Sequence, residues 1–329
     1  MVIQNDPTRN LALELVRVTE AAALAAGRFM GRGDKEGADQ AAVNAMRIVL
    51  QTVDMNGVIV IGEGEKDNAP MLYNGERVGN GSGLEFDVAV DPIDGTRPLA
   101  FGRSNSLATV AIAPKGTMFD PGPFVYMNKL AVGPESKGMI DIEKPLIDNL
   151  KAIAKAKRKD VEDLTTIILD RPRHNDIVAE IRKAGARIRQ IPDGDVAAAL
   201  MTAQPNSGVD VLIGIGGTPE GVIAACALRA MGGEIQGKMY ARDEDELNRG
   251  REAGYDFDKI LTMDDLVSSE DVFFTATGIT DGELLKGVRY FGSGASTDSL
   301  VVRGLTGTVR QIRATHQIHK LRQFSAVKY

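Results

Sequence analysis

The sequence predicts an α/β protein with two domains. Residues 11–52 carry apolar side chains at helical spacing, and strand-like segments follow them. From residue 165 onward, strand-like and helical segments alternate, which is typical of a parallel sheet with helical crossovers. A chain of 329 residues is long enough for about two domains with cores of their own.

The first half is predicted to be two helices against a mostly β layer. After a polar leader, a helix from Leu11 to Phe29 should end at Gly31-Arg32-Gly33, whose glycines suit a C-terminal cap. A second helix is expected from about Glu36 to Thr52, with a buried apolar stripe. Strands are expected near residues 57–62, 86–91, 106–113 and 124–132.

The second half alternates between strands and helices. The predicted strands are Thr165–Leu169, Ala186–Ile191 and Val209–Ile215, and the predicted helices are His174–Lys183, Asp195–Met201 and Glu220–Ala230. The polar segment Arg242–Glu252 should be an exposed helix, and residues 299–312 should form a hairpin around Gly304. The Lys-rich stretch Ala152–Lys159 marks the expected boundary. We therefore predict a metal-binding α+β domain over residues 1–158 and an α/β domain with a parallel-type sheet and substrate-binding loops over residues 159–329.

The composition excludes several classes of function. The net charge of −6 argues against nonspecific nucleic-acid binding, which needs a basic surface, and the absence of Trp argues against a stacking surface for bases. No signal pattern and no apolar run of membrane-spanning length occurs. The single cysteine, Cys226, allows no disulfide framework and lies in an apolar stretch. It is expected to be a small buried hydrophobe in a cytoplasmic protein.

Two carboxylate-rich motifs follow strand-like segments and form the principal candidate site. One reads Asp91-Pro92-Ile93-Asp94-Gly95-Thr96, and the other reads Gly62-Glu63-Gly64-Glu65-Lys66-Asp67. Like charges crowded at strand ends repel one another unless a cation lies between them. Oxygen ligands without nearby Cys or His favour Mg²⁺ or Mn²⁺ over zinc. The alternative is that the Asp-Pro and Asp-Gly pairs simply form turns.

Three loops of the second half also follow predicted strands. They contain Asp170-Arg171-Pro172-Arg173, Pro192-Asp193-Gly194-Asp195, and the glycine-rich segment Gly214–Gly221. Ligands of open parallel sheets bind beyond the carboxyl ends of the strands, and arginine forks are suited to phosphate. Turn formation by Asp193 and helix capping by Asp195 are the structural alternatives. The glycine loop lacks the full dinucleotide-binding spacing, so a nicotinamide site is only a competing hypothesis.

Further candidates are weaker. Lys35 and Asp39 are four residues apart and would share a helix face, where an exposed ion pair is the simpler interpretation. The histidines His174, His316 and His319 lack metal-ligand spacing, and surface roles are expected for them. No serine-hydrolase motif occurs.

Together, these motifs resemble those of the class II fructose-1,6-bisphosphatases of bacteria, within the superfamily of lithium-sensitive, metal-dependent sugar and inositol phosphatases. The resemblance extends over nearly the whole chain, from Gly31–Lys35 through Asp91–Thr96 to Ala276–Thr280. It implies a two-domain sugar-phosphatase fold of layered helices and sheets, similar to inositol monophosphatase and fructose bisphosphatase. It also implies hydrolysis of the 1-phosphate of fructose 1,6-bisphosphate, as in gluconeogenesis.

The resemblance also implies roles for individual residues. The implied metal ligands are Asp39, Glu63, Asp91, Asp94 and Glu220, and the positions implied to matter for catalysis are Lys35, Asp67 and Thr96. Substrate contacts are implied at Asp94, Gly95, Thr96, Tyr126, Arg171, Pro172, Arg173, Asp193, Gly194, Asp195 and Gly217. Some relatives have Glu where Asp94 stands, which leaves the number and preference of the metals open. Some relatives also have Lys where Arg171 stands.

The expected function is therefore a sugar-bisphosphate phosphatase that uses Mg²⁺ or Mn²⁺ and forms a homo-oligomer, either a dimer or a tetramer. Partners are expected to be small-molecule sugar bisphosphates, with no nucleic acid and no membrane. A related sugar, inositol or nucleotide phosphatase, or an enzyme that also accepts sedoheptulose 1,7-bisphosphate, is the alternative of the same chemistry. A noncatalytic sugar-phosphate sensor is the alternative of another class.

Overall fold

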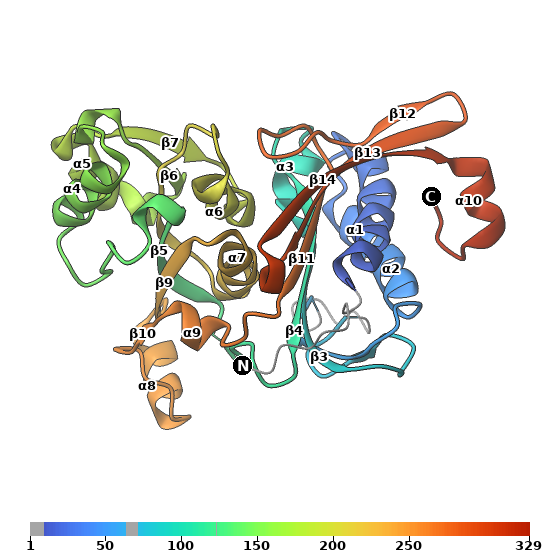
Figure 1. Ribbon diagram of the computed structural model, residues 1–329, viewed down its shortest axis with the longest axis horizontal. Coiled ribbons are helices and arrows are strands. Elements are labelled where there is room, and N and C mark those ends of the chain that lie inside the picture. The colour runs from blue at the N-terminus through green and yellow to red at the C-terminus, as the bar shows by residue number, and fades with distance from the viewer. Residues whose placement is uncertain (1–9, 64–71, 123) are drawn as a thin grey trace.

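The computed structural model describes residues 10–63, 72–122 and 124–329. Two β-sheets stand side by side, with helices between them and on both outer faces (Figure 1). The sequence of layers is helix, sheet, helix, sheet, helix. This arrangement confirms the predicted α/β class.

The first sheet has eight strands in the order β12-β13-β11-β4-β3-β1-β2, with β14 paired to β13. Its strands are β1 (Asn56–Ile61), β2 (Arg77–Val78), β3 (Glu85–Asp94), β4 (Leu107–Pro114), β11 (Phe273–Gly278), β12 (Arg289–Phe291), β13 (Gly294–Arg303) and β14 (Thr308–Gln317). β13 and β14 form the antiparallel hairpin predicted around Gly304. β3 and β4 lie inside the sheet, with a neighbouring strand on each side.

The second sheet has six strands in the order β10-β9-β5-β8-β6-β7. Its strands are β5 (Tyr126–Val132), β6 (Thr165–Leu169), β7 (Arg187–Ile191), β8 (Val211–Gly217), β9 (Glu234–Met239) and β10 (Ile260–Leu261). β6 pairs in parallel with β7 and β8, as the alternation predicted. The sheet as a whole is mixed, because β5 enters from the first part of the chain and lies antiparallel between β8 and β9.

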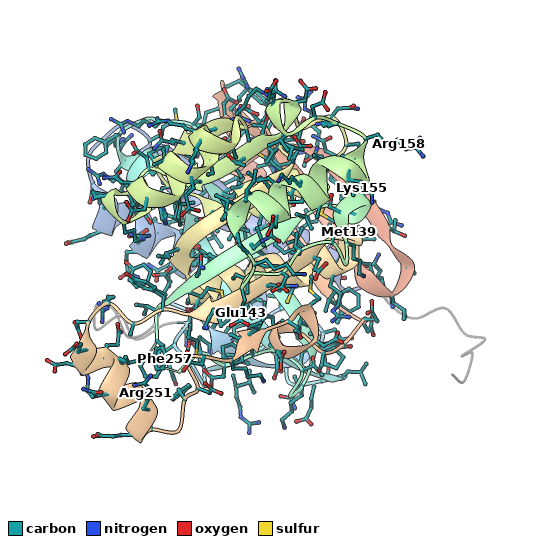
Figure 2. All side chains as sticks on the ribbon, turned by 90° about the vertical axis from the view of Figure 1, so that its left-hand side faces the viewer. Met139, Glu143, Lys155, Arg158, Arg251 and Phe257 are labelled. Atoms are coloured by element: carbon teal, nitrogen blue, oxygen red, sulfur yellow. The ribbon has the colours of Figure 1, made fainter. Side chains whose placement is uncertain are left out.

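The long helices cover the sheets in pairs. α1 (Ala12–Ala26) and α2 (Lys35–Leu50) cover the outer face of the first sheet, and α6 (Asp195–Ala203) and α7 (Thr218–Met231) lie between the sheets (Figure 1). α4 (Leu146–Lys157) and α5 (Asn175–Ala184) cover the outer face of the second sheet, where the labelled Lys155 and Arg158 mark the end of α4 (Figure 2). The shorter helices are α3 (Thr96–Ala100), α8 (Glu244–Glu252), α9 (Met263–Leu266), α10 (Ile318–Phe324), η1 (Gly27–Phe29), η2 (Pro134–Ser136), η3 (Val161–Asp163), η4 (Pro172–His174) and η5 (Gly304–Thr306).

One large apolar core joins the two sheets through the central helices. It contains side chains of β3, β4 and β11 from the first sheet, β5 and β8 from the second, and nearly every apolar residue of α7. Cys226 on α7 is fully buried, which confirms the expected small buried hydrophobe, and burial raises the pKa of its thiol to about 12. The central helices therefore hold the ends of the two sheets in a fixed relation.

The sheets do not divide the chain near residue 158. β5 precedes the predicted boundary and belongs to the second sheet, whereas β11 to β14 follow it and complete the first sheet. The chain therefore crosses to the second sheet and later returns to the first. Local periodicity cannot predict this, because it depends on pairing between segments that are distant in the sequence. No helix of the described residues is long and apolar enough to cross a bilayer.

Candidate functional site

The end of β3 brings Asp91 and Asp94 to one place. In a regular strand, residues three apart point to opposite faces. Here Asp91 lies opposite Thr109 and Asp94 opposite Leu107, so three steps along β3 match only two along β4. This bulge turns both carboxylates to one side. Gly95 then adopts a left-handed conformation (φ 91°), which ends the strand and starts α3.

The two aspartates lie among other carboxylates. Burial, followed by the charges of Asp94, Glu63 and Glu220, raises the pKa of Asp91 well above its usual range. Burial, followed by the charges of Asp195, Glu220 and Asp193, does the same to the pKa of Asp94. Asp94 is 4% exposed, and none of the described residues forms a hydrogen bond with its Oδ2 atom. A buried carboxylate oxygen in this position is suited to bind a cation.

Thr96 and Asp39 are in direct contact. The Thr96 hydroxyl lies 3.0 Å from Asp39 Oδ1 on α2 and 3.3 Å from the Ile93 carbonyl oxygen. Its single proton can be donated to only one of these oxygens at a time, and its lone pairs remain able to accept a hydrogen bond. The contact links the α2 helix to the Asp-Gly-Thr turn.

A second Asp-Gly turn, from the other sheet, faces the first. Gly194 is left-handed (φ 87°) and caps the N-terminus of α6, so Asp195 is the first helical residue rather than the cap. A Cβ atom on Gly194 would lie 3.8 Å from Asp94 Oδ2. The loop containing Asp193 therefore approaches the carboxylates of the first sheet, and the two Asp-Gly turns meet at the candidate site.

Glu220 reaches the same place from the first turn of α7. Its carboxylate folds back over Gly217, where an added Cβ atom would lie only 1.7 Å from Glu220 Oε2. A side chain at position 217 would require this carboxylate to move, so Gly217 leaves room for Glu220 in its observed position. Pro219 fits the first turn as predicted.

The predicted phosphate-binding residues form a separate group beside the carboxylates. Arg171 donates to the carbonyl oxygen of Pro192 at 2.6 Å and pairs with Asp193 at 3.5 Å, so it supports the loop before α6. Arg173 donates through Nε and Nη2 to the carbonyl oxygen of Ile215 and stacks on Tyr126, 5.2 Å from the ring centroid. Pro172 starts the short η4 helix that carries Arg173.

Lys129 is a residue that the sequence analysis missed. It lies on β5, is 3% exposed, and donates to Asp195 Oδ2 at 2.5 Å and to the Gly217 carbonyl oxygen at 2.8 Å. Gly216 leaves the space for this pair, since a Cβ atom there would lie 2.1 Å from Asp195 Oδ2. Lys129 thus joins the start of α6 to the end of β8. Its position in the run Tyr126–Val132, directly before Leu130-Ala131-Val132, was the available signal for a buried lysine.

Replacing Lys129 with Met is expected to lower the free energy of unfolding by about 3–5 kcal/mol, the usual cost of leaving one charge of a buried pair uncompensated. Urea unfolding of the single variant and of Lys129→Met/Asp195→Asn tests this. The double variant should regain much of the stability, because no unpaired charge remains. Lys115→Met is the matched control, since its exposed pair with Glu85 should contribute less than about 1 kcal/mol.

The other two residues predicted to matter for catalysis are Lys35 and Asp67. Lys35, at the start of α2, lies 6.0 Å from the ring centroid of Phe101. Asp67 lies outside the described residues, as do Glu65 and Lys66. Within the described ranges, no three His, Cys, Asp or Glu side chains already form a group that could hold a metal ion. The carboxylates of the candidate site are therefore electrostatic neighbours rather than a complete coordination shell.

The donor set nevertheless fits a hard divalent cation. It consists of carboxylate oxygens at the end of β3 and in the first turn of α7, with an unpaired oxygen on Asp94 and raised pKa values on Asp91 and Asp94. Hard cations prefer such oxygen ligands, and a divalent charge would relieve the mutual repulsion.

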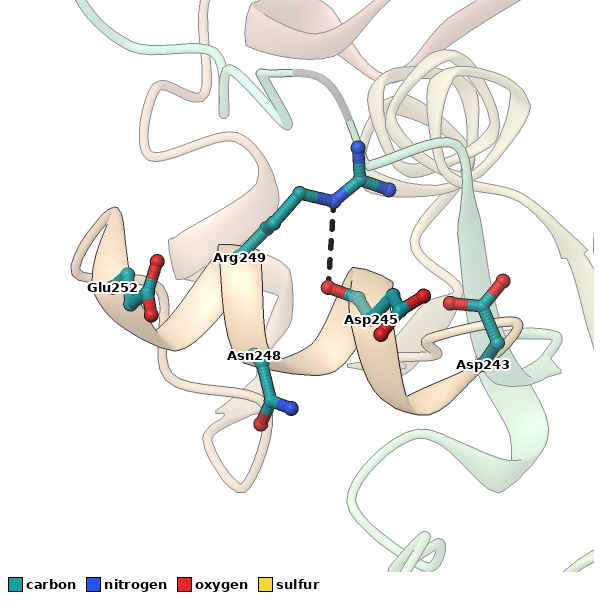
Figure 3. Close-up of a pocket in the computed structure, with 5 residues that line it drawn as sticks. All are labelled: Asp243, Asp245, Asn248, Arg249 and Glu252. Carbon is teal, nitrogen blue, oxygen red and sulfur yellow. Dashed lines mark hydrogen bonds between the residues drawn. The ribbon is translucent and has the colours of Figure 1, made fainter.

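A different hollow lies along α8 and has another character (Figure 3). It is lined by Asp243, Asp245, Asn248, Arg249 and Glu252, all of them exposed. Arg249 donates only to the backbone oxygen of Asp245 there, at 3.3 Å. None of the residues singled out by the sequence motifs lies in this hollow, so the candidate site remains the meeting point of the two Asp-Gly turns.

Comparison with known proteins agrees with the motifs. Residues 9–316 match the family described as bacterial fructose-1,6-bisphosphatase, glpX-encoded. The chain is 48% identical over 325 residues to fructose-1,6-bisphosphatase 1 class 2 of Escherichia coli (strain K12), covering 95% of this chain and 96% of that protein. Fructose-1,6-bisphosphatase class 2 of Shigella flexneri is similar to the same extent.

Among solved structures, an extragenic suppressor from Pyrococcus furiosus is similar to this chain at a TM-score of 0.29 and 16% identity. The similarity covers 58% of this chain and 68% of that chain. A likeness of this size supports no conclusion about the fold.

Proposed function

Because the chain belongs to the bacterial class II fructose-1,6-bisphosphatases, we propose that the site where the two Asp-Gly turns meet carries out the reaction of that family. The protein is a phosphoric monoester hydrolase of carbohydrate metabolism that acts on fructose 1,6-bisphosphate. The products are fructose 6-phosphate and phosphate, as gluconeogenesis requires. The observation that supports this assignment best is the approach of Gly194, in the loop between β7 and α6, to Asp94 at the end of β3.

The proposed metal-holding residues are the carboxylates described above, and the proposed ion is Mg²⁺ or Mn²⁺. Members of the family use a divalent metal ion. The proposed ligands are Asp39, Glu63, Asp91, Asp94 and Glu220. When bound, the metal would supply charge neutralisation for the transferred phosphoryl group and lower the pKa of an attacking water.

The protein's own residues would orient the reaction. Thr96, held by Asp39, is proposed to accept a hydrogen bond from the attacking water and align it. Asp67 is proposed to accept the proton of that water, and Lys35 to assist catalysis from the start of α2. Burial of Asp94 keeps bulk water from competing for its free oxygen.

Arg173 is proposed to grip the phosphate that is not hydrolysed. Among the described residues, the Arg173 guanidinium donates through Nε and Nη2 to the carbonyl oxygen of Ile215. Its Nη1 group therefore remains to donate to a phosphate oxygen. The Asp193–Asp195 turn pairs with Arg171 and approaches Asp94 of the carboxylate cluster. Its proposed task is to contact the sugar, together with Gly95, Tyr126 and Gly217. Binding energy from the remote phosphate would thereby position the reacting one.

Replacing Arg173 with Ala is expected to raise KM for fructose 1,6-bisphosphate about 10- to 100-fold, the effect of losing a charge-assisted hydrogen bond. Initial rates over a substrate series measure this. Arg182→Ala, an exposed arginine on α5, is the control and should leave KM unchanged. If the parent enzyme hydrolysed fructose 1-phosphate at low concentration as fast as fructose 1,6-bisphosphate, the proposal that the site binds both phosphates would be contradicted.

A panel of sugar phosphates, assayed with Mg²⁺, Mn²⁺ and chelator, tests the function as a whole. Sedoheptulose 1,7-bisphosphate and inositol phosphates belong to the panel, because the carboxylate motif is compatible with both. The glycines of the 214–221 segment argue against a dinucleotide site, since Gly216 and Gly217 make room for internal carboxylates. If a fluorescence titration detects no binding of NAD(P)H, the hypothesis of a dinucleotide site is wrong.

Three finer proposals complete the assignment. We propose that the enzyme is cytoplasmic and that it assembles into a homodimer or homotetramer, which light scattering would distinguish. We propose, further, that the family falls within the lithium-sensitive phosphatase superfamily. Inhibition of phosphate release by Li⁺ would support this placement, and insensitivity would oppose it.

A further inference from the structure

His174 is buried, although its sequence context suggested a surface role. Its side chain is 0% exposed, and both of its ring nitrogens form hydrogen bonds. Nδ1 lies 2.7 Å from the carbonyl oxygen of Leu169, and Nε2 lies 2.8 Å from the backbone nitrogen of Ile215. Leu169 ends β6 and Ile215 lies near the end of β8, which is its parallel neighbour. The ring therefore bridges the carboxyl ends of two strands beside the proposed substrate site.

These contacts determine the tautomer. A backbone N–H group can only donate, so Nε2 must accept the hydrogen bond from Ile215. Nδ1 then carries the proton and donates it to Leu169, and the ring is neutral. Burial lowers the pKa of His174, which agrees with a neutral ring. Gly214 leaves the ring its space, because a Cβ atom there would lie 3.0 Å from Nε2.

His174 and Arg173 hold opposite sides of one residue. The N–H group of Ile215 donates to His174, and its carbonyl oxygen accepts from Arg173 at 2.7 Å and 3.2 Å. The same arginine stacks on Tyr126, which lies opposite Gly217 in the β5–β8 pairing. The place of the Arg173 guanidinium thus depends on where the backbone of Ile215 is held.

We infer that His174 is a positioning residue for substrate binding, which holds the Ile215 backbone so that Arg173 is presented to the remote phosphate of the bisphosphate. This inference rests on the proposed role of Arg173. It predicts that loss of the Ile215 contact weakens substrate binding with little effect on the chemical step. It also predicts that the effect disappears when Arg173 is absent.

Two amide variants separate the two hydrogen bonds of the ring. His174→Asn retains a donor near the position of Nδ1 but does not reach Ile215, whereas His174→Gln places an amide oxygen near the position of Nε2. The Asn variant should raise KM about five- to tenfold, as expected for one lost hydrogen bond, with kcat within about twofold. The Gln variant should stay within about twofold of the parent in both constants. Affinity for fructose 6-phosphate, measured by calorimetry, should follow KM.

A double-mutant cycle gives the decisive comparison. In the Arg173→Ala background, His174→Asn should change KM by less than about twofold, because residues that act as one unit are not additive. Additive effects, or a raised KM in the Gln variant, would overturn the inference. If the Asn variant does not fold, the Gln variant still tests it. If Arg173→Ala itself leaves KM unchanged, the proposed grip on the remote phosphate fails instead, and the two failures are distinguishable.

Discussion

Removing divalent metal ions with EDTA is expected to abolish phosphate release from fructose 1,6-bisphosphate, and added Mg²⁺ or Mn²⁺ is expected to restore it. The carboxylates around Asp91 and Asp94 raise one another's pKa values, so the site is poorly arranged to accept a phosphate anion by itself. Bound metal ions stabilise the developing charge of the transition state by several kcal/mol. Losing about 4 kcal/mol of this stabilisation lowers the rate roughly a thousandfold.

A coupled phosphate assay on the full chain measures the loss. EDTA that has been saturated with Mg²⁺ beforehand is the control for nonspecific effects of the chelator. Asp94→Asn should weaken Mn²⁺ binding, as measured by electron paramagnetic resonance without turnover. Glu85→Gln, an exposed position on the same strand, should not weaken it. Full activity after verified removal of the metal would refute the assignment of the carboxylate cluster.

Local sequence patterns were sufficient to predict the elements that frame the site. The strand before Asp91 and the helix after Asp195 were both predicted, because apolar periodicity and Asp-Gly turns are local signals. The 3.0 Å contact between Asp39 and Thr96 was not predicted by any local pattern, because α2 and the turn after β3 are far apart in the sequence. The structure adds the bulge in β3, which explains how two aspartates three residues apart face the same side.

What local patterns could not predict depends on pairing between distant segments. Lys129 and Asp195 are 66 residues apart, and nothing near Lys129 in the sequence identifies its partner. His174 is buried because β6 and β8 are neighbouring strands, so that its ring can form hydrogen bonds with the backbone at the ends of both. The antiparallel entry of β5 into the second sheet has the same origin. Such contacts are set by topology rather than by the periodicity of any one segment.

Replacing Thr96 with Ala is expected to lower kcat about 10²- to 10⁴-fold, the usual range for lost assistance to proton transfer. The hydroxyl is held by Asp39 at the edge of the carboxylate cluster, where its lone pairs can align a water molecule. KM should change little, because the interaction matters mainly in the transition state. Steady-state kinetics with saturating Mg²⁺ would measure both constants.

A purely structural role for Thr96 predicts a different result. Its hydroxyl also lies 3.3 Å from the carbonyl oxygen of Ile93, three residues earlier, and a lost turn or cap contact costs only about 1 kcal/mol of stability. Thr117 is a matched control, since its hydroxyl donates to the carbonyl oxygen of Pro114, also three residues earlier. Thr117→Ala should therefore cost similar stability and leave kcat unchanged.

Thr96→Ser distinguishes the hydroxyl from the methyl group. Serine retains the group that contacts Asp39, so much of the activity should remain if the hydroxyl aligns the attacking water. Loss of the methyl group alone should affect packing rather than kcat. If the Ser variant folds normally and is as inactive as Ala, or if Ala retains a near-normal kcat, Thr96 does not align the water. The contact with Asp39 would then serve to hold α2 against the turn after β3.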